Sequence, residues 1–534
     1  MSAPRPASLT SSSVRELALL VTASLDGGAS PDDAAGDVVV TGVTLDSRAV
    51  RPGDLYAALP GSRAHGADFA AQVAQAGAVA VLTDADGVLR LRDAGVDLPV
   101  ITVEAPRSVL GALAAQIYGT TDLNLTMVGI TGTNGKTTTA YLVASALDVL
   151  GQRTGLIGTV ETRIGDERIK SVRTTPESTD LHAILAVMDE RDTDTCVMEV
   201  SSHALSQHRV DGVVFDLALF TNLSQDHLDF HADMEDYFSA KAQLFTPERS
   251  TRGLICVDDI WGRRLAEQSG VPVTTLTTQA DQAADWVVTV DPTEPARFTL
   301  RGSGIELDLR SALPGDFNVA NTAMAAVALL LLGEDTDAVG RAILTDPHVP
   351  GRMEKVTPTQ VSDVDSGLLA VVDYAHTPDA VEAALAALRP TTSGRLVVVL
   401  GAGGDRDRGK RHGMGRAAAG LADVVVVTDD NPRSEDPAQI RAAVVEGAQS
   451  IDTTAVLVEV GGRRDAIREA VRLAREGGPG SVIAVVGKGH ETGQEIAGVV
   501  EPFDDRLELQ AALDGTTQDG TTQDGATSDG EVTT

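Results

Sequence analysis

A glycine-rich turn between a predicted strand and a predicted helix constrains this chain more than any other segment. Residues 128–139 read VGITGTNGKTTT; the apolar run LTMVGI leads into the glycines, and an alanine-rich stretch follows them and ends at Gly151. A buried strand that enters a glycine-rich turn and then a helix points several backbone N–H groups and one lysine toward a phosphate. The segment therefore predicts that the chain binds and spends a nucleoside triphosphate.

This segment is a variant of the common phosphate-binding pattern G-x-x-x-x-G-K-[ST], because Ile130 stands where the first glycine would fall. The physical parts of such a loop are nevertheless present. Gly132 and Gly135 let the backbone approach phosphate oxygens, Lys136 offers a positive charge, and Thr137 can hold Mg²⁺. The alternative interpretation is an ordinary glycine turn with a solvated lysine.

Length and charge limit the possible architectures and partners. A chain of 534 residues exceeds what one hydrophobic core usually supports, so we expect two to four domains. The net charge of −34 argues against attraction to nucleic acid or to an anionic membrane surface. We therefore expect no nucleic-acid and no membrane partner. The expected partners are small-molecule substrates, and the expected state is a monomer.

Two further features favour a cytoplasmic protein. The two cysteines, Cys196 and Cys256, do not form a C-x-x-C pair, which fits a reducing compartment and excludes a cysteine-rich structural zinc site. The opening residues MSAPRPASLTSSSV lack an apolar signal core, and the longest apolar run, Ala323 to Leu332, is far shorter than the ~18 residues of a membrane-spanning helix.

Strand and helix patterns divide the chain into three α/β segments and a tail. The first, residues 1–120, holds strand-like runs and short helices. The second, residues 121–350, starts with the phosphate loop, continues through the strands TDTCVMEV and DLALFTN, and closes with a helix stopped by Gly333. The third, residues 351–512, alternates apolar strands with helices, which predicts a Rossmann-like, doubly wound parallel sheet. Residues 513–534 are poor in apolar residues, and we expect a disordered tail.

Polar residues follow two strands of the second segment. Strand TCVMEV ends at Glu199, and DLALFTN runs into LSQDHLDFH, which contains Asp226, His227, Asp229 and His231. A carboxylate-rich edge beside a phosphate loop suits Mg²⁺ better than zinc, because no H-E-x-x-H pattern is present. The alternative is a polar loop with capping aspartates.

The third segment has charged residues after its strands. GAGGDRDRG fails as a dinucleotide fingerprint because Arg406 stands at the third glycine position. What remains is a loop that carries Arg406, Arg408, Lys410 and Arg411, and we expect it to form an anion-attracting edge. Two more strands lead into Asn431-Pro432-Arg433 and into Lys488, His490 and Glu491. Guanidinium groups and a glutamate at neighbouring strand ends could hold a zwitterion; the alternative is a solvated, charged rim.

Taken together, these motifs resemble the Mur ligases of bacterial peptidoglycan synthesis. The resemblance runs in order from about residue 40 to residue 506 and rests on TGTNGKTTT, TTPES, MEVSSHAL, FTNLSQDHLDFH, SAKAQLF, GDFNVAN, PGRME, DYAHTPD, GGDRDRGKR, TDDNPR and GKGHE. Within the family it is closest to the members that add diaminopimelate, through the run Asp430-Asn431-Pro432-Arg433.

The resemblance implies an ATP- and Mg²⁺-dependent ligase with three domains. Its implied reaction adds meso-2,6-diaminopimelate to the UDP-N-acetylmuramoyl-L-alanyl-D-glutamate precursor (a UDP-muramoyl dipeptide) through an acyl phosphate. The N-terminal domain would bind the UDP-muramoyl end, the central domain ATP, and the C-terminal domain the amino acid. The alternatives are a lysine-adding Mur ligase, a folylpolyglutamate synthase and a catalytically silent nucleotide-binding regulator.

Position by position, the resemblance assigns roles to residues of this chain. The implied catalytic residues are Lys136, Glu199, His227 and Lys241; Thr137, Glu199, His227 and Lys241 would serve the metal, with Lys241 carbamylated to N6-carboxylysine. Without the resemblance, the residues around Lys241 favour an ordinary helix-surface lysine.

The resemblance also implies which residues bind the three substrates. The implied ATP-binding residues are Gly132, Thr133, Asn134, Gly135, Lys136, Thr137, Thr138, Asn318, Asn321, Arg352 and Asp373. The implied UDP-muramoyl-peptide contacts are Ser47, Thr174, Thr175, Ser201, Gln207 and Arg209. The implied diaminopimelate contacts are Arg406, Asp430, Asn431, Pro432, Arg433, Gly487 and Glu491.

Overall fold

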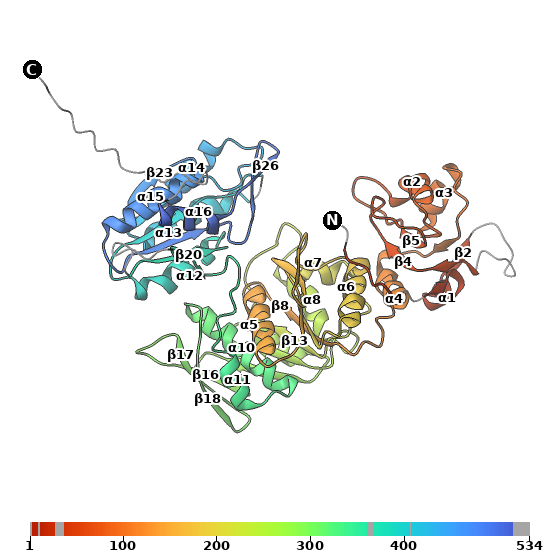
Figure 1. Cartoon of the computed structure of the whole chain (residues 1–534), viewed down its shortest axis with the longest axis horizontal. Coiled ribbons are helices and arrows are strands. Elements are labelled where there is room, and N and C mark those ends of the chain that lie inside the picture. Colours follow the sequence, from red (N-terminus) through yellow and green to blue (C-terminus); the bar gives the residue numbers. More distant parts are fainter. Residues whose placement is uncertain (1–2, 9–10, 27–36, 360–366, 406, 516–534) are drawn as a thin grey trace, which may run out of the picture. The chain divides into compact units, whose positions relative to one another are not determined.

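Three mostly parallel sheets follow one another along the chain (Figure 1). The structure is a computed structural model and describes residues 3–8, 11–26, 37–359, 367–405 and 407–515. The chain divides into two compact units. The first comprises Met1–Arg310 with Ala320–Pro347, and the second comprises Ser311–Val319 with His348–Thr534. The predicted α/β class is confirmed.

The first sheet has five strands, in the order β2 (Ser24–Asp26), β7 (Val100–Thr102), β6 (Ala80–Thr83), β5 (Asp54–Ala57) and β4 (Gly42–Thr44). Strands β4 to β7 are parallel, and β2 pairs antiparallel to β7. Its helices are α1 (Val14–Leu20), α2 (Ala70–Gln75), α3 (Ala85–Asp93) and α4 (Pro106–Tyr118), and β1 (Ser12–Ser13) pairs with β3 (Val39–Val40).

The second sheet has eleven strands. In order they are β11 (Glu167–Lys170), β10 (Glu161–Ile164), β9 (Thr154–Ile157), β12 (Thr195–Glu199), β8 (Thr126–Thr131), β13 (Leu217–Phe220), β14 (Gly253–Cys256), β15 (Val273–Thr277), β16 (Trp286–Val290), β17 (Arg297–Gly302) and β18 (Ile305–Arg310). In this spatial order, the seven neighbouring strands β9, β12, β8, β13, β14, β15 and β16 run parallel. Antiparallel strands extend the sheet at both edges, β10 and β11 at one and β17 and β18 at the other. The phosphate-loop strand β8 therefore lies between the strands that end at Glu199 and Phe220.

Helices cover both faces of this sheet. On one face, α6 (Ser178–Glu190), α8 (Met234–Ala242) and α9 (Ile260–Gln268) pack against alternate strand residues such as Met127 and Met198. On the other, α5 (Lys136–Val149) packs against β8, β9 and β12 and against α11 (Thr336–Ala342). The remaining helices are α7 (Ser202–Ser206) and α10 (Asp316–Leu332), and Gly333 at φ +100° follows the last residue of α10, as the sequence predicts.

The third sheet has the order β19 (Glu354–Lys355), β20 (Leu369–Asp373), β24 (Val482–Val486), β21 (Leu396–Leu400), β22 (Val424–Val427) and β23 (Val456–Glu459), and all strands but β19 are parallel. Successive residues of each strand point to opposite faces of the sheet, and helices cover each face. Val398 and Val425 pack with α12 (Pro378–Leu388), α13 (Gly409–Leu421) and α14 (Pro437–Gln449). Val397 and Val426 pack with α15 (Arg463–Glu476) and α16 (Asp505–Asp514). The predicted doubly wound sheet is confirmed.

The limits predicted for the three segments stay predictions. The described residues up to Tyr118 include a five-stranded sheet of their own, yet they belong to the same compact unit as the second sheet. Most of the other compact unit lies from His348 onward. Helix α16 continues to Asp514, whereas the rest of the predicted tail, from residue 516, lies outside the described residues.

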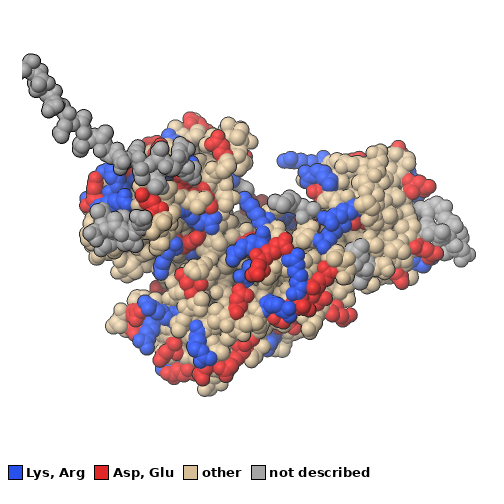
Figure 2. All heavy atoms as spheres, viewed as in Figure 1, with Lys and Arg blue, Asp and Glu red and all other residues tan. Residues whose placement is uncertain are grey.

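Acidic and basic side chains are interspersed on the face drawn in Figure 2. The acidic excess is therefore not gathered there into one single-sign surface. Within the described ranges, no helix is long and apolar enough to cross a membrane.

Candidate active site

The phosphate loop connects β8 to the first turn of α5. Gly132 (φ +146°) and Gly135 (φ +86°) adopt conformations that favour glycine, and a Cβ atom at either one would collide with Thr221 Oγ1 or Asn321 Oδ1. Gly135 is the N-cap of α5 and provides no side-chain cap. The positive end of this helix can therefore meet an anion.

Two amide groups of this loop bind the protein itself. The N–H of Thr133 donates to Asn222 O (2.9 Å), and the N–H of Asn134 donates to Asn222 Oδ1 (3.0 Å). These bonds tie the loop to the segment after β13. The first turn of α5, at Lys136, Thr137 and Thr138, has no side-chain cap, so its amides have no acceptor within the helix.

Two lysines meet at the start of the loop. Lys136 Nζ donates to Gly132 O and Thr133 O, both at 2.9 Å, and Lys241 Nζ donates to Gly132 O at 2.8 Å. Lys241 is 1% exposed and lies 4.6 Å from the centre of the Tyr237 ring. Burial, reinforced by the charge of Lys136, lowers the pKa of Lys241 well below its usual value. The sequence around Lys241 favours a surface lysine, and its burial corrects that expectation.

Glu199 lies next to Thr137, where the loop leads into α5. It is the last residue of β12, is 1% exposed, and accepts hydrogen bonds from Thr137 Oγ1 (2.9 Å), Thr159 N (2.7 Å) and Thr159 Oγ1 (3.1 Å). A carboxylate and a threonine hydroxyl side by side at a phosphate loop form the oxygen-rich set that Mg²⁺ prefers. The two residues therefore fit a magnesium ion that also binds phosphate oxygens.

His227 belongs to a cluster of rings. Its ring lies 5.0 Å from that of His203 and 5.9 Å from that of Tyr237, and His203 stacks on Phe230 at 4.1 Å. Burial, together with Lys136 and Lys241, lowers the pKa of His227 although Asp226 opposes the shift. A neutral imidazole can bind a metal ion. Within the residues described, no group of three or more His, Cys, Asp or Glu is arranged to hold a metal. Any magnesium ion here would take water or phosphate oxygens as its further ligands.

The residues assigned to the muramoyl peptide lie beside Glu199, except for one. Thr175 Oγ1 donates to Glu199 O (2.9 Å), and the N–H of Ser201 donates to Thr175 Oγ1 (3.1 Å). Arg209 donates to Gln207 Oε1 (2.6 Å) and pairs with Glu177 (3.0 Å), while Thr174 contacts Thr159. Ser47 instead follows β4 of the five-stranded sheet. The assigned muramoyl-peptide contacts therefore lie on two different sheets.

The residues assigned to the adenine and ribose lie on three segments. Asn318 and Asn321 stand one turn apart on α10; Asn318 donates to Pro314 O (2.7 Å), and Asn321 Oδ1 lies against Thr139 and Gly135. In the second unit, the Arg352 guanidinium lies 4.5 Å from the Tyr374 ring centre. Burial raises the pKa of Asp373, which accepts hydrogen bonds from the N–H groups of Met353 and Ala375.

A buried lysine organises the carboxyl ends of β22 and β24. Lys488 is fully buried, and its ammonium lies 3.0 Å from Asn431 Oδ1, 3.1 Å from Glu491 Oε2 and 3.5 Å from Asp430 Oδ1. Asn431 Nδ2 also donates to Glu491 Oε2 (2.8 Å), and Gly487 lies beside Asp430. The structure thus gathers four residues predicted for the diaminopimelate site around a lysine to which the sequence assigned no role of its own.

Arg433 lies at the same edge. Its Nη1 donates to Gly404 O (2.6 Å), and its Nε lies 3.3 Å from Glu495 Oε2. Arg433 itself has φ +52°, in the left-handed region. Pro432, which precedes it, is buried, and Arg406 lies outside the described residues.

The predicted anion-attracting edge after β21 needs correction. Arg411 is buried, and its guanidinium binds Glu435 through two hydrogen bonds, of 3.1 and 2.8 Å. Arg408 also pairs with Glu435, at 3.2 Å. Hydrogen bonds from Arg411 and from the N–H of Asp405, together with the charges of both arginines, lower the pKa of this carboxyl to about 2. Two arginines expected to attract a ligand therefore share one carboxylate of the protein, which offsets part of their positive charge.

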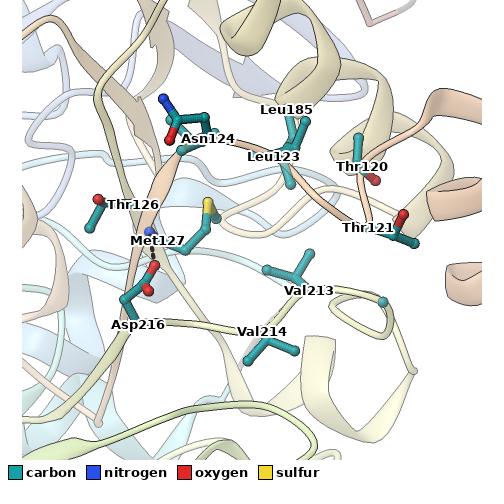
Figure 3. A pocket seen from close by; sticks show the side chains of 12 residues that line it. Thr120, Thr121, Leu123, Asn124, Thr126, Met127, Leu185, Val213, Val214 and Asp216 are labelled. Carbon is teal, nitrogen blue, oxygen red and sulfur yellow. Dashed lines mark hydrogen bonds between the residues drawn. The ribbon is translucent and has the colours of Figure 1, made fainter.

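A separate pocket of about 360 Å³ lies at the opposite end of β8 (Figure 3). Its lining includes Thr126, Met127, Leu185, Val213 and Asp216, and Asp216 Oδ2 accepts a hydrogen bond from Met127 N (2.8 Å). The lining residues include no lysine or arginine. This pocket is therefore distinct from the phosphate loop, which follows the carboxyl end of β8.

Comparison with known proteins gives consistent results along the chain. Family models match residues 39–118 ("Mur ligase family, catalytic domain"), 130–329 ("Mur ligase middle domain") and 351–489 ("Mur ligase, glutamate ligase domain"). A Streptomyces avermitilis protein named UDP-N-acetylmuramoyl-L-alanyl-D-glutamate–2,6-diaminopimelate ligase is 54% identical, with 96% of this chain and 98% of that protein covered.

Two further relatives agree. A Leifsonia xyli protein named UDP-N-acetylmuramyl-tripeptide synthetase is 48% identical, with 90% of this chain and 93% of that protein covered. A solved structure titled as a UDP-N-acetylmuramoyl-L-alanyl-D-glutamate–2,6-diaminopimelate ligase is 31% identical and matches with a TM-score of 0.66, covering 95% of this chain and 99% of that one. The similarity therefore extends over nearly the whole chain.

Proposed function

The chain belongs to the Mur ligase family, and from this premise we propose that it joins meso-2,6-diaminopimelate to UDP-N-acetylmuramoyl-L-alanyl-D-glutamate at the expense of ATP. The observation that carries the proposal is the set of charged and hydroxyl groups at one phosphate loop. Lys136 and Lys241 both bind Gly132 O, and Thr137 binds Glu199. The name of the 54% identical Streptomyces protein supports the choice of substrates.

The proposed reaction forms an amide in two steps. The side-chain carboxylate of D-glutamate takes the γ-phosphoryl group of ATP, which gives an acyl phosphate and ADP. The neutral amine of diaminopimelate then attacks the acyl carbon, phosphate leaves with the electron pair of the broken C–O bond, and the amine loses a proton. Activation is needed because phosphate is a far better leaving group than oxide.

The loop residues of this chain stabilise the charge that develops on the phosphoryl group. The Lys136 ammonium, now bonded to loop carbonyls, can turn to the β- and γ-phosphates, where it neutralises charge in the transition state. Thr137, Glu199 and His227 would hold Mg²⁺, which when bound offsets the negative charge of the phosphates. Lys241, carbamylated to N6-carboxylysine, would supply a further anion beside the loop.

The other substrate contacts are proposed as follows. Outside the loop, ATP would be bound by Asn318, Asn321, Arg352 and Asp373. The muramoyl peptide would be bound by Thr174, Thr175, Ser201, Gln207 and Arg209. The UDP-muramoyl end would be bound by Ser47. For the amino acid, Arg433 would bind the distal carboxylate and Glu491 the distal ammonium, with Asp430 and Asn431 beside them. Buried Lys488 holds Asn431 and Glu491 in place. A monomeric state and a cytoplasmic location stay predictions.

One experiment tests the proposed function. The purified protein is incubated with the UDP-dipeptide, ATP, Mg²⁺ and either meso-diaminopimelate or L-lysine, while ADP release is followed and the product is weighed by mass spectrometry. We expect ADP release coupled to a UDP-tripeptide that contains diaminopimelate. A lysine-containing product in its place indicates a lysine-adding ligase, and no ADP with either amino acid indicates a silent nucleotide-binding regulator.

A further inference from the structure

Glu495 gives Arg433 a carboxylate partner within the protein. Its Oε2 atom lies 3.3 Å from Arg433 Nε, while Arg433 Nη1 is held by Gly404 O. Both side chains are partly exposed, Arg433 by 25% and Glu495 by 38%. The guanidinium that would bind the distal carboxylate of the amino acid is therefore already shared with an acid of the chain.

Backbone hydrogen bonds fix Glu495 beside the amino-acid site. Its N–H donates to Asn431 Oδ1 (3.0 Å), and its carbonyl accepts from Arg433 N (3.0 Å). The N–H of Ala497 donates to Arg433 O (2.7 Å), so the hairpin of β25 (Gly493–Ile496) and β26 (Val499–Pro502) is joined to both ends of the run 431–433. Only the side chain of Glu495 can move away from Arg433.

The carboxylate of Glu495 should weaken the binding of diaminopimelate and strengthen the binding of lysine. The far carbon of diaminopimelate bears an ammonium and a carboxylate, whereas that of lysine bears only an ammonium. A distal carboxylate at Arg433 has Glu495 as a like-charged neighbour, which weakens its binding. A distal ammonium without that carboxylate is attracted by Glu495 as well as by Glu491.

We propose that Glu495 is a specificity-determining residue that shifts the amino-acid preference away from dicarboxylic substrates and toward those with only a distal ammonium. This inference rests on the proposed function and deepens it. An arginine without a carboxylate partner in the protein would be left unpaired by lysine and would exclude it. Glu495 removes much of that penalty, because Arg433 keeps a carboxylate partner when lysine is bound.

The expected effect is modest because the pair is partly exposed. Ion pairs in such positions contribute about 0.2–1 kcal/mol, which corresponds to about a 1.5- to 5-fold change in binding. For Glu495→Gln, kcat/KM for diaminopimelate should rise and that for lysine should fall, each within that range. Lysine is measured as a substrate or, where turnover is too slow, as a competitive inhibitor of diaminopimelate consumption.

Matched variants sharpen the test. Glu501→Gln removes an exposed carboxylate from β26, opposite Gln494 in the same hairpin, and should leave both values unchanged. Glu495→Asp, which retracts the carboxylate, should act in the same direction as Glu495→Gln but less strongly. In an Arg433→Ala background, Glu495→Gln should no longer raise the use of diaminopimelate.

The outcomes separate this inference from the proposed function. If the wild-type protein consumes neither amino acid, the proposed function fails. If it consumes diaminopimelate but Glu495→Gln leaves the ratio of the two amino acids unchanged, or shifts it toward lysine, only the role of Glu495 is overturned.

Discussion

Lys136 and Lys241 donate hydrogen bonds to the same acceptor, the carbonyl oxygen of Gly132, at 2.9 and 2.8 Å. Two ammonium groups on one oxygen repel each other, and Lys241 is also buried. Burial first, and then the charge of Lys136, disfavour the charged form of Lys241 and lower its pKa well below the usual value. A larger fraction of Lys241 is therefore the neutral amine near neutral pH, the form that can react with CO₂.

We predict that Lys241 forms a carbamate. Protein equilibrated with ¹³C-bicarbonate near neutral pH should show a carbamate resonance that Lys241→Arg abolishes, and this variant should lose about 10²- to 10³-fold in kcat, the range found when one electrostatic contact to a transition state is removed. Lys170→Arg, an exposed lysine at the end of β11, serves as the control. Wild-type kcat in Lys241→Arg would contradict the assignment.

Glu199 should control the magnesium requirement. Glu199→Gln keeps the shape of the side chain but removes the negative charge next to Thr137. We expect the Mg²⁺ concentration for half-maximal ADP release to rise at least about tenfold, as for other disrupted metal environments. Mn²⁺ binding followed by electron paramagnetic resonance should weaken in parallel. Glu167→Gln, on exposed β11, should change neither value, and an unaltered metal requirement in Glu199→Gln would exclude this carboxylate from the metal site.

Arg433 should determine the use of the distal carboxylate. Removing one partner of a charge pair in a binding site typically costs about 2–5 kcal/mol; because Glu495 already shares the guanidinium, we expect the lower end, near a 30-fold rise in KM for diaminopimelate. The KM for ATP should stay the same. Arg408→Ala, an exposed arginine at the same sheet edge, is the control, and an unchanged KM for diaminopimelate in Arg433→Ala would remove Arg433 from the site.

Much of this architecture could be predicted from the sequence because the strands of parallel sheets are short apolar runs that end in polar residues. Glu199 follows TCVM, and Asp430 to Arg433 follow VVVVT, so their places at strand ends required only the strand limits and the rule that ligands bind at carboxyl edges. The family resemblance is confirmed by three matching family models and by close relatives.

The individual partners of charged residues could not be predicted in this way. Lys488 is one more charged residue in the loop GKGHE, and its burial depends on Asp430, Asn431 and Glu491 coming together from two strand ends. Arg411 was expected to face a ligand, but its partner Glu435 lies 24 positions away in the sequence. Short sequence patterns do not show which charged residues, far apart in the sequence, come into contact in the fold.

His182 should make the stability of the first unit depend on pH. It is buried, contacts Thr120 Oγ1 (2.6 Å) and Asp211 O (3.0 Å), and burial lowers its pKa to about 4 from 6.5. Between these values the unfolded state binds a proton that the folded state does not, so this contribution is complete above pH 6.5 and is lost as the pH falls toward 4.

Lowering the pH from 7.5 to 5 should therefore reduce the free energy of unfolding by about 2 kcal/mol through His182 alone. Urea unfolding at the two pH values measures the change, and His182→Gln should show a smaller loss than the wild type. His208→Gln, at a half-exposed site beside Asp211, is the control. An equal loss in His182→Gln and wild type would assign the pH dependence to other groups.

The ion pair between Arg463 and Asp505 should be essential for the stability of the second unit. Both side chains are fully buried; the guanidinium donates to Asp505 at 2.7 and 2.6 Å and to Val486 O at 3.0 Å. Arg463→Met leaves a buried carboxylate without its counter-charge, and we expect a loss of about 3–5 kcal/mol in the free energy of unfolding. Arg468→Met, in the exposed pair with Asp465 on the same helix, should cost less than about 1 kcal/mol.

The double variant Arg463→Met with Asp505→Leu distinguishes a buried charge from lost packing. If the uncompensated carboxylate causes the loss, replacing both partners should restore much of the stability, because well-packed apolar residues can substitute for a buried ion pair. If packing and the bond to Val486 dominate, the double variant should be at least as unstable as Arg463→Met. Denaturant unfolding of the full chain, followed by a probe in the second unit, decides between these two origins.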